Sequence, residues 1–182
     1  MNSIYSVGAV KKIRGHDGQG YSCNILKNGK KIAEVLEDGW GGGLQINWLD
    51  NKTSATVKNR TYEDKEFTFE GTVEESLFYK EILKLPKIPA DGELPEMNTS
   101  IDIVIDEMVN DLLNIKAVES DFKKKLTIQC ADGTLLNWKI TPDYTVEKLK
   151  AHAEKKYPGS KVMNDLPVES VVNIYKKSRI FR

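Results

Sequence analysis

The chain has 182 residues, of which 40% are hydrophobic and 30% are charged, and its 27 basic and 27 acidic side chains leave no formal net charge. This length allows one domain, or two small ones, with a real hydrophobic core. No apolar run approaches the length of a membrane span, and the start lacks the basic-then-apolar order of a signal peptide, so a cytosolic protein is expected.

The charge is unevenly distributed along the chain. Residues 1–35 carry six basic and two acidic side chains, residues 91–121 carry nine acidic side chains against Lys116 alone, and residues 122–182 carry thirteen basic against six acidic. Such segregation is compatible with a nucleic-acid-binding face beside an acidic, nucleic-acid-like face. The simpler interpretation, which we favour, is that the acidic helix lies near the basic part of the same chain.

The first fifty residues predict an antiparallel β-meander. Residues 4–14 alternate loosely as in a strand, and the loop GHDGQG follows. Two strand-like runs then flank Asn28-Gly29, the strongest short hairpin signal, because a type I′ turn needs positive φ at both central residues. After DGWGGG, residues 44–49 predict a further strand.

The middle of the chain predicts helices and a linker. Residues 55–60 and 66–71 are weaker strand candidates or a polar excursion. Thr72 and Glu75 form a capping box that starts a helix ended by Pro86. Residues 86–99 are rich in proline and are expected to form a linker between a first part, 1–85, and a second, 100–182, although the two parts can also share one core.

An acidic amphipathic helix is the clearest element of the sequence. Apolar residues recur at three- and four-residue spacing on one side, and acidic residues lie off that face. The apolar set is Ile101, Val104, Ile105, Met108, Leu112 and Ile115; the acidic set is Asp102, Asp106, Glu107 and Asp111.

The C-terminal part predicts a ββαβ unit. A hairpin is expected around Asp132-Gly133, a helix from about Thr145 to a stop at Pro158-Gly159, and a last strand with a basic end over residues 170–180. The hairpin and helix resemble a β-grasp unit in pattern, and fold alone does not give function. The predicted fold class is therefore α+β: a meander with a helix, a central acidic helix, and this β-grasp-like unit.

Two glycine-rich loops of the meander form the candidate site. If the loops meet, His16, Asp17, Asp38 and Trp40 surround one cleft. The backbone amides of Gly41, Gly42 and Gly43 can then hold an anion, Lys11, Lys12 and Arg14 supply positive charge, and Trp40 offers a stacking face. His16 beside a carboxylate is able to act as a general acid or base on an RNA backbone.

The glycines also have a structural interpretation, which we favour over catalysis. Glycine is required wherever φ is positive or two backbones pass closely, and aspartate before glycine is typical of turns. Dinucleotide, Walker, GxSxG and HExxH motifs are not found. Cys23 and Cys130 lack metal-ligand spacing and are expected to be separate reduced thiols. No cofactor and no metal is expected.

The segment KIRGHDGQGYSCNILKNGKKIAEVLEDGWGGGLQINW resembles the N-terminal signature of a group of small proteins encoded by phages and other mobile elements of bacteria. The resemblance is good over residues 9–49 and weak beyond them. Some small mobile-element proteins of this kind are type II anti-CRISPR proteins, which block an RNA-guided DNA nuclease. The resemblance therefore implies a type II nuclease or its guide RNA as partner, in the cytoplasm of a bacterial host, and assigns no residue a role.

Three hypotheses remain open at this point. The first is an anti-CRISPR inhibitor that docks through Asp102, Asp106 and Asp111, or holds RNA phosphates with basic C-terminal residues, namely Lys155, Lys156, Lys176, Lys177 and Arg179. The second is a ribonuclease, centred on His16 and Asp17, that cleaves the guide. The third is an accessory binding module of a mobile element without inhibitory activity.

Overall fold

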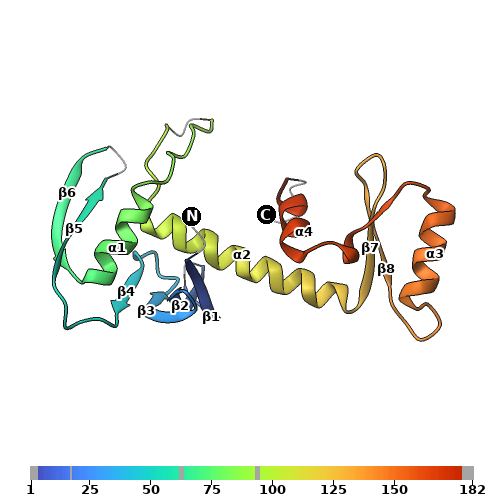
Figure 1. The fold of residues 1–182 in the computed structure, drawn as a ribbon, viewed down its shortest axis with the longest axis horizontal. Helices are drawn as coiled ribbons and strands as arrows, with labels where there is room; N and C mark the ends of the chain where they lie inside the picture. The colour runs from blue at the N-terminus through green and yellow to red at the C-terminus, as the bar shows by residue number, and fades with distance from the viewer. Residues whose placement is uncertain (1–3, 17, 62–63, 93–94, 178–182) are drawn as a thin grey trace. The chain divides into compact units, whose positions relative to one another are not determined.

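The chain is a mixed α+β protein, as the sequence predicted (Figure 1). The computed structural model describes residues 4–16, 18–61, 64–92 and 95–177. Their contacts divide the chain into two compact units, Met1–Asn110 and Asp111–Arg182. Helix α2 (Ile101–Phe122) begins in the first unit and ends in the second.

The first unit is dominated by strands. Its strands are β1 (Tyr5–Arg14), β2 (Gln19–Lys27), β3 (Lys30–Glu37), β4 (Gln45–Trp48), β5 (Ala55–Arg60) and β6 (Glu66–Gly71), and its first helix is α1 (Val73–Ile82). Strands β1 to β4 form one antiparallel sheet in chain order, which confirms the predicted meander. Asn28 and Gly29 have φ values of 50° and 77°, so the predicted turn between β2 and β3 is confirmed with its positive φ at both positions.

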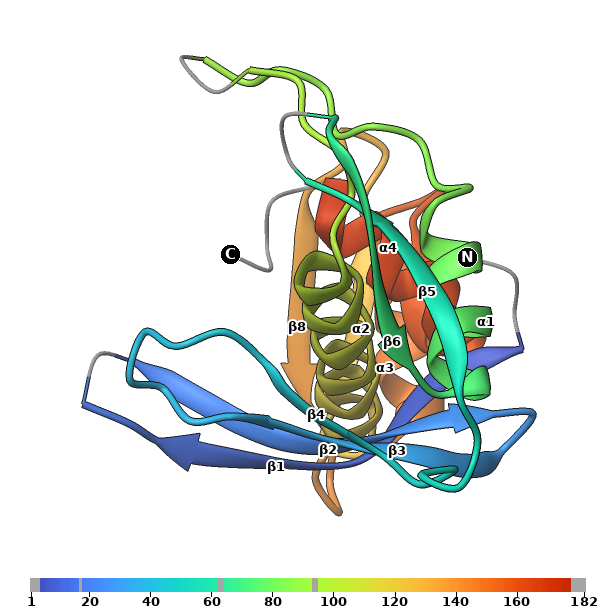
Figure 2. The same cartoon turned by 90° about the vertical axis from the view of Figure 1, so that its left-hand side faces the viewer.

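The meander sheet has one buried and one exposed face. The alternation is clearest in β2, where Tyr21, Cys23 and Ile25 are buried and the residues between them are more exposed. The first turns of α2 lie along the sheet (Figure 2), and the hydroxyl of Tyr21 donates a 2.6 Å hydrogen bond to Asp106 Oδ1. The buried side of the sheet therefore faces α2.

Helix α1 supplies the largest fully buried side chain among the described residues. The Phe78 side chain is fully buried, with its ring centroid 4.9 Å from that of Tyr5 and 5.8 Å from that of Trp48. Three side-chain oxygens accept hydrogen bonds from the first backbone N–H groups of the helix. The Thr53 hydroxyl accepts from the N–H of Val73, and Asp50 Oδ2 accepts from the N–H of Glu74. The Thr72 hydroxyl accepts from the N–H of Glu75. The predicted capping box is thus confirmed, and the chain before β5 reinforces it.

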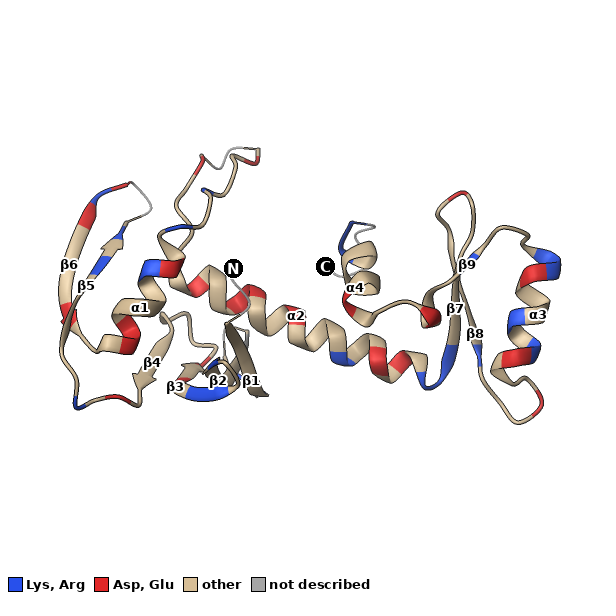
Figure 3. Ribbon diagram, viewed as in Figure 1, with Lys and Arg blue, Asp and Glu red and all other residues tan. Residues whose placement is uncertain are grey.

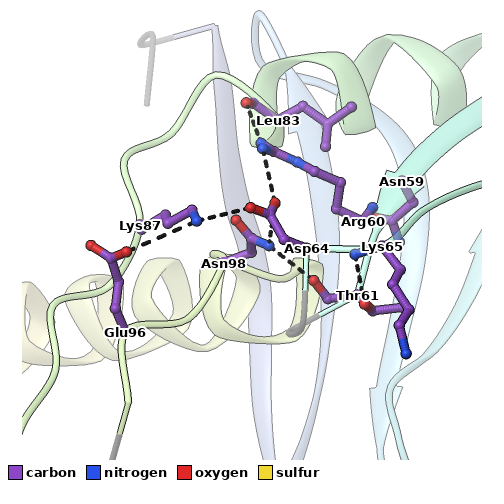
Figure 4. Close-up of polar contacts among 9 residues, drawn as sticks. All are labelled: Asn59, Arg60, Thr61, Asp64, Lys65, Leu83, Lys87, Glu96 and Asn98. Carbon is purple, nitrogen blue, oxygen red and sulfur yellow. Dashed lines mark hydrogen bonds and ion pairs between the residues drawn. The ribbon is translucent and has the colours of Figure 1, made fainter.

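A polar cluster ties the β5–β6 hairpin to the segment after α1 (Figure 4). Asp64 Oδ2 accepts a 2.9 Å hydrogen bond from Lys87, and its Oδ1 accepts one of 3.0 Å from Asn98. These two bonds hold the pKa of the Asp64 carboxyl below its usual range. Arg60 donates to the carbonyl of Leu83 at 2.9 Å. The segment also forms an antiparallel bridge between Ile88 and Met97, so its described ends are joined to each other and, through Lys87 and Asn98, to the β5–β6 hairpin.

The second unit combines a small sheet with helices. Its further elements are β7 (Lys125–Gln129), β8 (Leu135–Lys139), α3 (Val146–Lys156), β9 (Lys161–Val162), the 3-10 helix η1 (Met163–Asp165) and α4 (Val168–Lys177). The strand order is β8-β7-β9, with both neighbours antiparallel to β7. The predicted hairpin and helix are confirmed, including Thr145 as the residue whose hydroxyl caps α3.

The predicted last strand over residues 170–180 is wrong, because the described part of this run is helical. Its β-branched residues resemble a strand locally, but Val171 and Val172 are buried beside Met163 and Val118. That packing places the apolar residues on one side of a helix. Pro167, just before Val168, accepts a hydrogen bond through its carbonyl from Val171, as expected for proline at a helix start. The ββαβ order is completed by β9 instead.

No helix in the described ranges is both long enough and apolar enough to cross a membrane.

Candidate functional site

The two glycine-rich loops of the meander meet. A Cβ atom placed on Gly15 would lie 2.3 Å from the carbonyl oxygen of Gly39, and one placed on Gly20 would lie 2.2 Å from that of Glu37. Both distances are far below any tolerable contact, so the backbones touch where only glycine fits. Gly39 also has a φ of 72°, a conformation that favours glycine. The convergence left open by the sequence is therefore present.

The contact between the loops brings His16 and Trp40 together. Their rings are stacked, with centroids 5.4 Å apart and planes inclined by 18°. The Trp40 side chain remains 63% exposed, the highest value among the large hydrophobic side chains found exposed in the described residues. An aromatic ring held by a neighbour and open to solvent offers a preformed stacking surface. Asp17, the other residue predicted beside His16, lies outside the described residues.

The carboxylates before Trp40 shape its turn. Asp38 Oδ1 accepts a 2.9 Å hydrogen bond from the backbone N–H of Trp40, and Glu37 Oε1 accepts one of 3.1 Å from that of Gly39. Both are local side-chain-to-backbone bonds of the kind that fix turns. Asp38 thus positions Trp40, whatever else it contacts.

The glycines after Trp40 give close access to the backbone. Gly41, Gly42 and Gly43 are exposed, and a Cβ placed on Gly42 or Gly43 would find no atom within 4 Å. Gly41 has a φ of 77°. Because these three exposed residues carry no side chains of their own, their peptide groups are accessible to an anion or to the edge of a planar ligand.

The predicted cations lie on β1, the strand that leads into the first loop. Lys11, Lys12 and Arg14 are exposed. The strand register pairs Lys11 with Ser22 and Lys12 with Tyr21, so that these two lysines project from opposite faces of the sheet. Lys11 is therefore on the exposed face and Lys12 on the face of Tyr21.

Sequence reasoning missed a groove on the exposed face of the sheet. It has a volume of about 730 Å³, and Lys11 lines it together with polar side chains from β2 to β4, namely Ser22, Asn24, Glu34, Gln45 and Asn47. The register places Lys11, Ser22, Leu36 and Gln45 in one row across the strands. The signal was the alternation of these polar residues with buried ones, which indicates a solvated sheet face rich in hydrogen-bonding groups.

The basic residues predicted in the C-terminal part lie on two different helices, and one of them is in an ion pair within the unit. Lys155 and Lys156 are exposed in the last turn of α3, and Lys177 is exposed on α4. Lys176 forms an ion pair with Asp111 of α2. Lys125 likewise pairs with Asp121 at 3.2 Å, so part of the basic charge is neutralised within the unit, as the simpler interpretation predicted. Arg179 lies outside the described residues.

The acidic residues of α2 are also partly engaged. In the first unit, Asp106 accepts the hydrogen bond from Tyr21, and burial together with the charge of Asp106 raises the pKa of Asp102. Burial and the bond to Asp106 raise the pKa of Tyr21, which keeps its hydroxyl protonated as the donor. Asp106 thus helps to hold the sheet, and Asp111 holds α4 in the second unit.

Comparison with known proteins found no matching family model, no significantly similar curated protein and no significantly similar solved structure. The chemistry of the site must therefore be read from its own residues. A stacked and exposed indole, accessible glycine peptides and an exposed cation on the adjoining strand suit a planar, anionic ligand. We call this set the loop platform; it comprises Arg14, His16, Trp40 and Gly41–Gly43, whereas Lys11 belongs to the groove on the exposed sheet face.

Proposed function

We propose that this chain is a mobile-element anti-defence protein that inhibits a type II RNA-guided DNA nuclease by contacting the nuclease and its guide RNA in the cytoplasm of a bacterial host. In this proposal the loop platform holds an unpaired stretch of the guide. The observation that carries the RNA contact is the Trp40 ring, which is stacked on His16 and remains largely exposed. Single-stranded nucleic acids bind to such rings by base stacking, with cations along their phosphates.

Binding is favoured over cleavage because Asp38, the described carboxylate beside the loop platform, is engaged in holding the turn of Trp40. The Asp38 carboxylate accepts a hydrogen bond from the backbone N–H of Trp40, and this bond accounts for the position of Asp38 in the site. General acid–base cleavage of RNA needs two proton-transferring groups arranged around one phosphate. His16 supplies one such group to the platform, and guide cleavage is therefore the second candidate function.

The RNA contact is tested by fluorescence anisotropy with a labelled single-stranded RNA. Trp40→Ala should weaken binding roughly tenfold, because stacking on one aromatic ring contributes about 1–3 kcal/mol. Leu49→Ala is the matched control, since Leu49 is a 46% exposed apolar residue of the same unit. Equal affinities of the two variants would overturn the platform as the RNA site.

The charge contribution is tested in the same assay. Arg14→Glu should weaken binding and flatten its salt dependence, whereas Lys52→Glu, which changes an exposed lysine after β4, should have little effect. Affinity that does not change with salt concentration would contradict a phosphate contact.

The inhibitory activity is tested by mixing the protein with a type II nuclease and its guide. Blocked DNA cleavage with an intact guide would support a binding inhibitor, and a shortened guide would support cleavage, with His16→Ala as the next variant. An active nuclease with an intact guide would reject inhibition of that nuclease and favour an accessory binding module, which a pull-down from a host lacking CRISPR would then test.

A further inference from the structure

The second unit has an aromatic groove that the proposed function does not use. It lies between β8, α3 and the loop that joins them, and has a volume of about 620 Å³. Trp138, Tyr144 and His152 line it, with Leu149 as its apolar side. The volume falls in the range of sites that hold small planar ligands.

Ring contacts hold Trp138 and His152 of the groove, and a backbone turn holds the main chain of Tyr144. The Trp138 ring is half-buried against the core of Leu126 and Leu149, and its centroid lies 5.6 Å from that of His152, with the planes at 81°. Tyr144 is 62% exposed, and reciprocal 3.1 Å backbone hydrogen bonds with Thr141 fix its turn. The exposed Tyr144 ring is thus presented from a closed turn.

Lysines accompany these rings. Lys139 of β8 and Lys148 of α3 line the groove, and Lys148 donates a 3.1 Å hydrogen bond to the carbonyl of Asp143. The Asp143 side chain is the acidic group at the same groove. Lys155 and Lys156 continue the positive charge at the end of α3, where lysines alternate with Glu147 and Glu154 along the helix (Figure 3). From β8 through α3 the basic side chains thus outnumber the acidic ones.

We propose that this groove binds an unpaired nucleobase of a single-stranded nucleic acid. The base stacks on Tyr144 and against Trp138, and the adjoining phosphates lie beside Lys139 and Lys148. A base combines a planar π-face with an adjacent anion, the combination that aromatic rings flanked by lysines recognise. An acidic peptide would use the lysines and leave the rings uncovered. The proposal goes beyond the loop platform because it concerns a different unit.

The test uses the full chain carrying Trp40→Ala, so that the platform neither stacks nor fluoresces. Of the remaining tryptophans, Trp48 is 7% exposed, and fluorescence quenching by an added ligand therefore reports on Trp138. Titration with a short single-stranded oligouridylate should quench the signal to saturation. A mononucleotide should bind at least several-fold more weakly, because it lacks the neighbouring phosphates.

Further substitutions in this background decide the site. Tyr144→Ala should weaken binding roughly tenfold, and Lys148→Glu should weaken it and reduce its salt dependence. Lys161→Glu on β9, an exposed lysine that does not line the groove, should leave binding unchanged. Circular dichroism verifies that each variant is folded, and Tyr144→Phe, which keeps the stacking ring, should bind like the parent.

Three results would overturn the proposal. They are unchanged affinity in both Tyr144→Ala and Lys148→Glu, equal affinity for the mononucleotide and the strand, and equal quenching by an oligoglutamate peptide, which would indicate an acidic protein partner. The Trp40→Ala background lacks the ring of the platform, so this experiment tests the groove alone. Failure of the groove proposal is therefore distinguishable from failure of the proposed function.

Discussion

Substitution of Gly15 by alanine tests the contact between the two glycine loops. The added Cβ would lie 2.3 Å from the carbonyl oxygen of Gly39. Comfortable separations of non-bonded heavy atoms are roughly 3.5 Å, so the two backbones must separate by about 1 Å. The atoms in the way are backbone atoms of Gly39, which no rotamer change can move aside.

The expected cost follows from that overlap. Forcing additional atoms into a packed contact costs about 1–3 kcal/mol, and a backbone neighbour favours the upper half of this range. We therefore expect Gly15→Ala to lower the free energy of unfolding by about 2 kcal/mol. Gly42→Ala is the matched control: its Cβ would meet no atom within 4 Å, so we expect a neutral or slightly stabilising change of up to about 1 kcal/mol.

The free energy of unfolding of both variants is measured by urea denaturation, with tryptophan fluorescence as the signal. The same substitution should also disturb the His16–Trp40 stack, so Gly15→Ala should shift the emission of Trp40 in the folded state. If the two variants differ in stability by less than about 0.5 kcal/mol, the loops are not in contact and the reasoning fails.

Further substitutions test the packing and capping of each unit. Asp50→Ala should cost about 1 kcal/mol at neutral pH, because the carboxylate accepts a 2.6 Å hydrogen bond from Thr53 and caps α1. Burial raises the pKa of Asp50, but its hydrogen bonds together lower the pKa by more, so the pKa of the folded state lies below the usual value. The stability contributed by Asp50 is then present above its unfolded-state pKa and is lost as the pH falls through its folded-state pKa. The difference in the free energy of unfolding between wild type and Asp50→Ala, measured by urea denaturation, should therefore narrow with acidification. A difference that stays constant with pH would argue against the cap. Phe78→Ala should cost about 3–5 kcal/mol by chemical denaturation, since the side chain is fully buried, and a loss below about 1 kcal/mol would contradict that burial. Asn164→Ala should cost about 1–3 kcal/mol and accelerate hydrogen exchange at the amide of Thr127, which donates to Asn164 Oδ1 at 2.8 Å; unchanged exchange would exclude this bond.

Much of the local structure was predictable because short-range physics determines it. Asn28-Gly29 favours positive φ wherever it occurs, and Thr72 with Glu75 satisfies helix amides within one turn of chain. Asp132-Gly133 and Thr145 act in the same way in the second unit. The apolar spacing of residues 101–115 likewise predicted α2, since one side of the helix had to be buried.

The last helix was not predictable on these terms. Residues 170–177 are rich in β-branched side chains, which favour strands when considered locally. Burial of Val171 and Val172 against Met163 overrode that preference, because a helix places both on one packed side. Propensity is a weak prior, and the tertiary partner decided.

The sequence by itself determined the turns, the caps, the amphipathic helix and the glycines of the candidate site. Tertiary structure alone decided that the two glycine loops touch, that Trp40 lies against His16, and that Trp138, Tyr144 and His152 line one groove. The physical reason is one of range. A turn or cap is stabilised by atoms a few residues apart, whereas a contact between distant loops depends on strand register and on backbone approach over many residues.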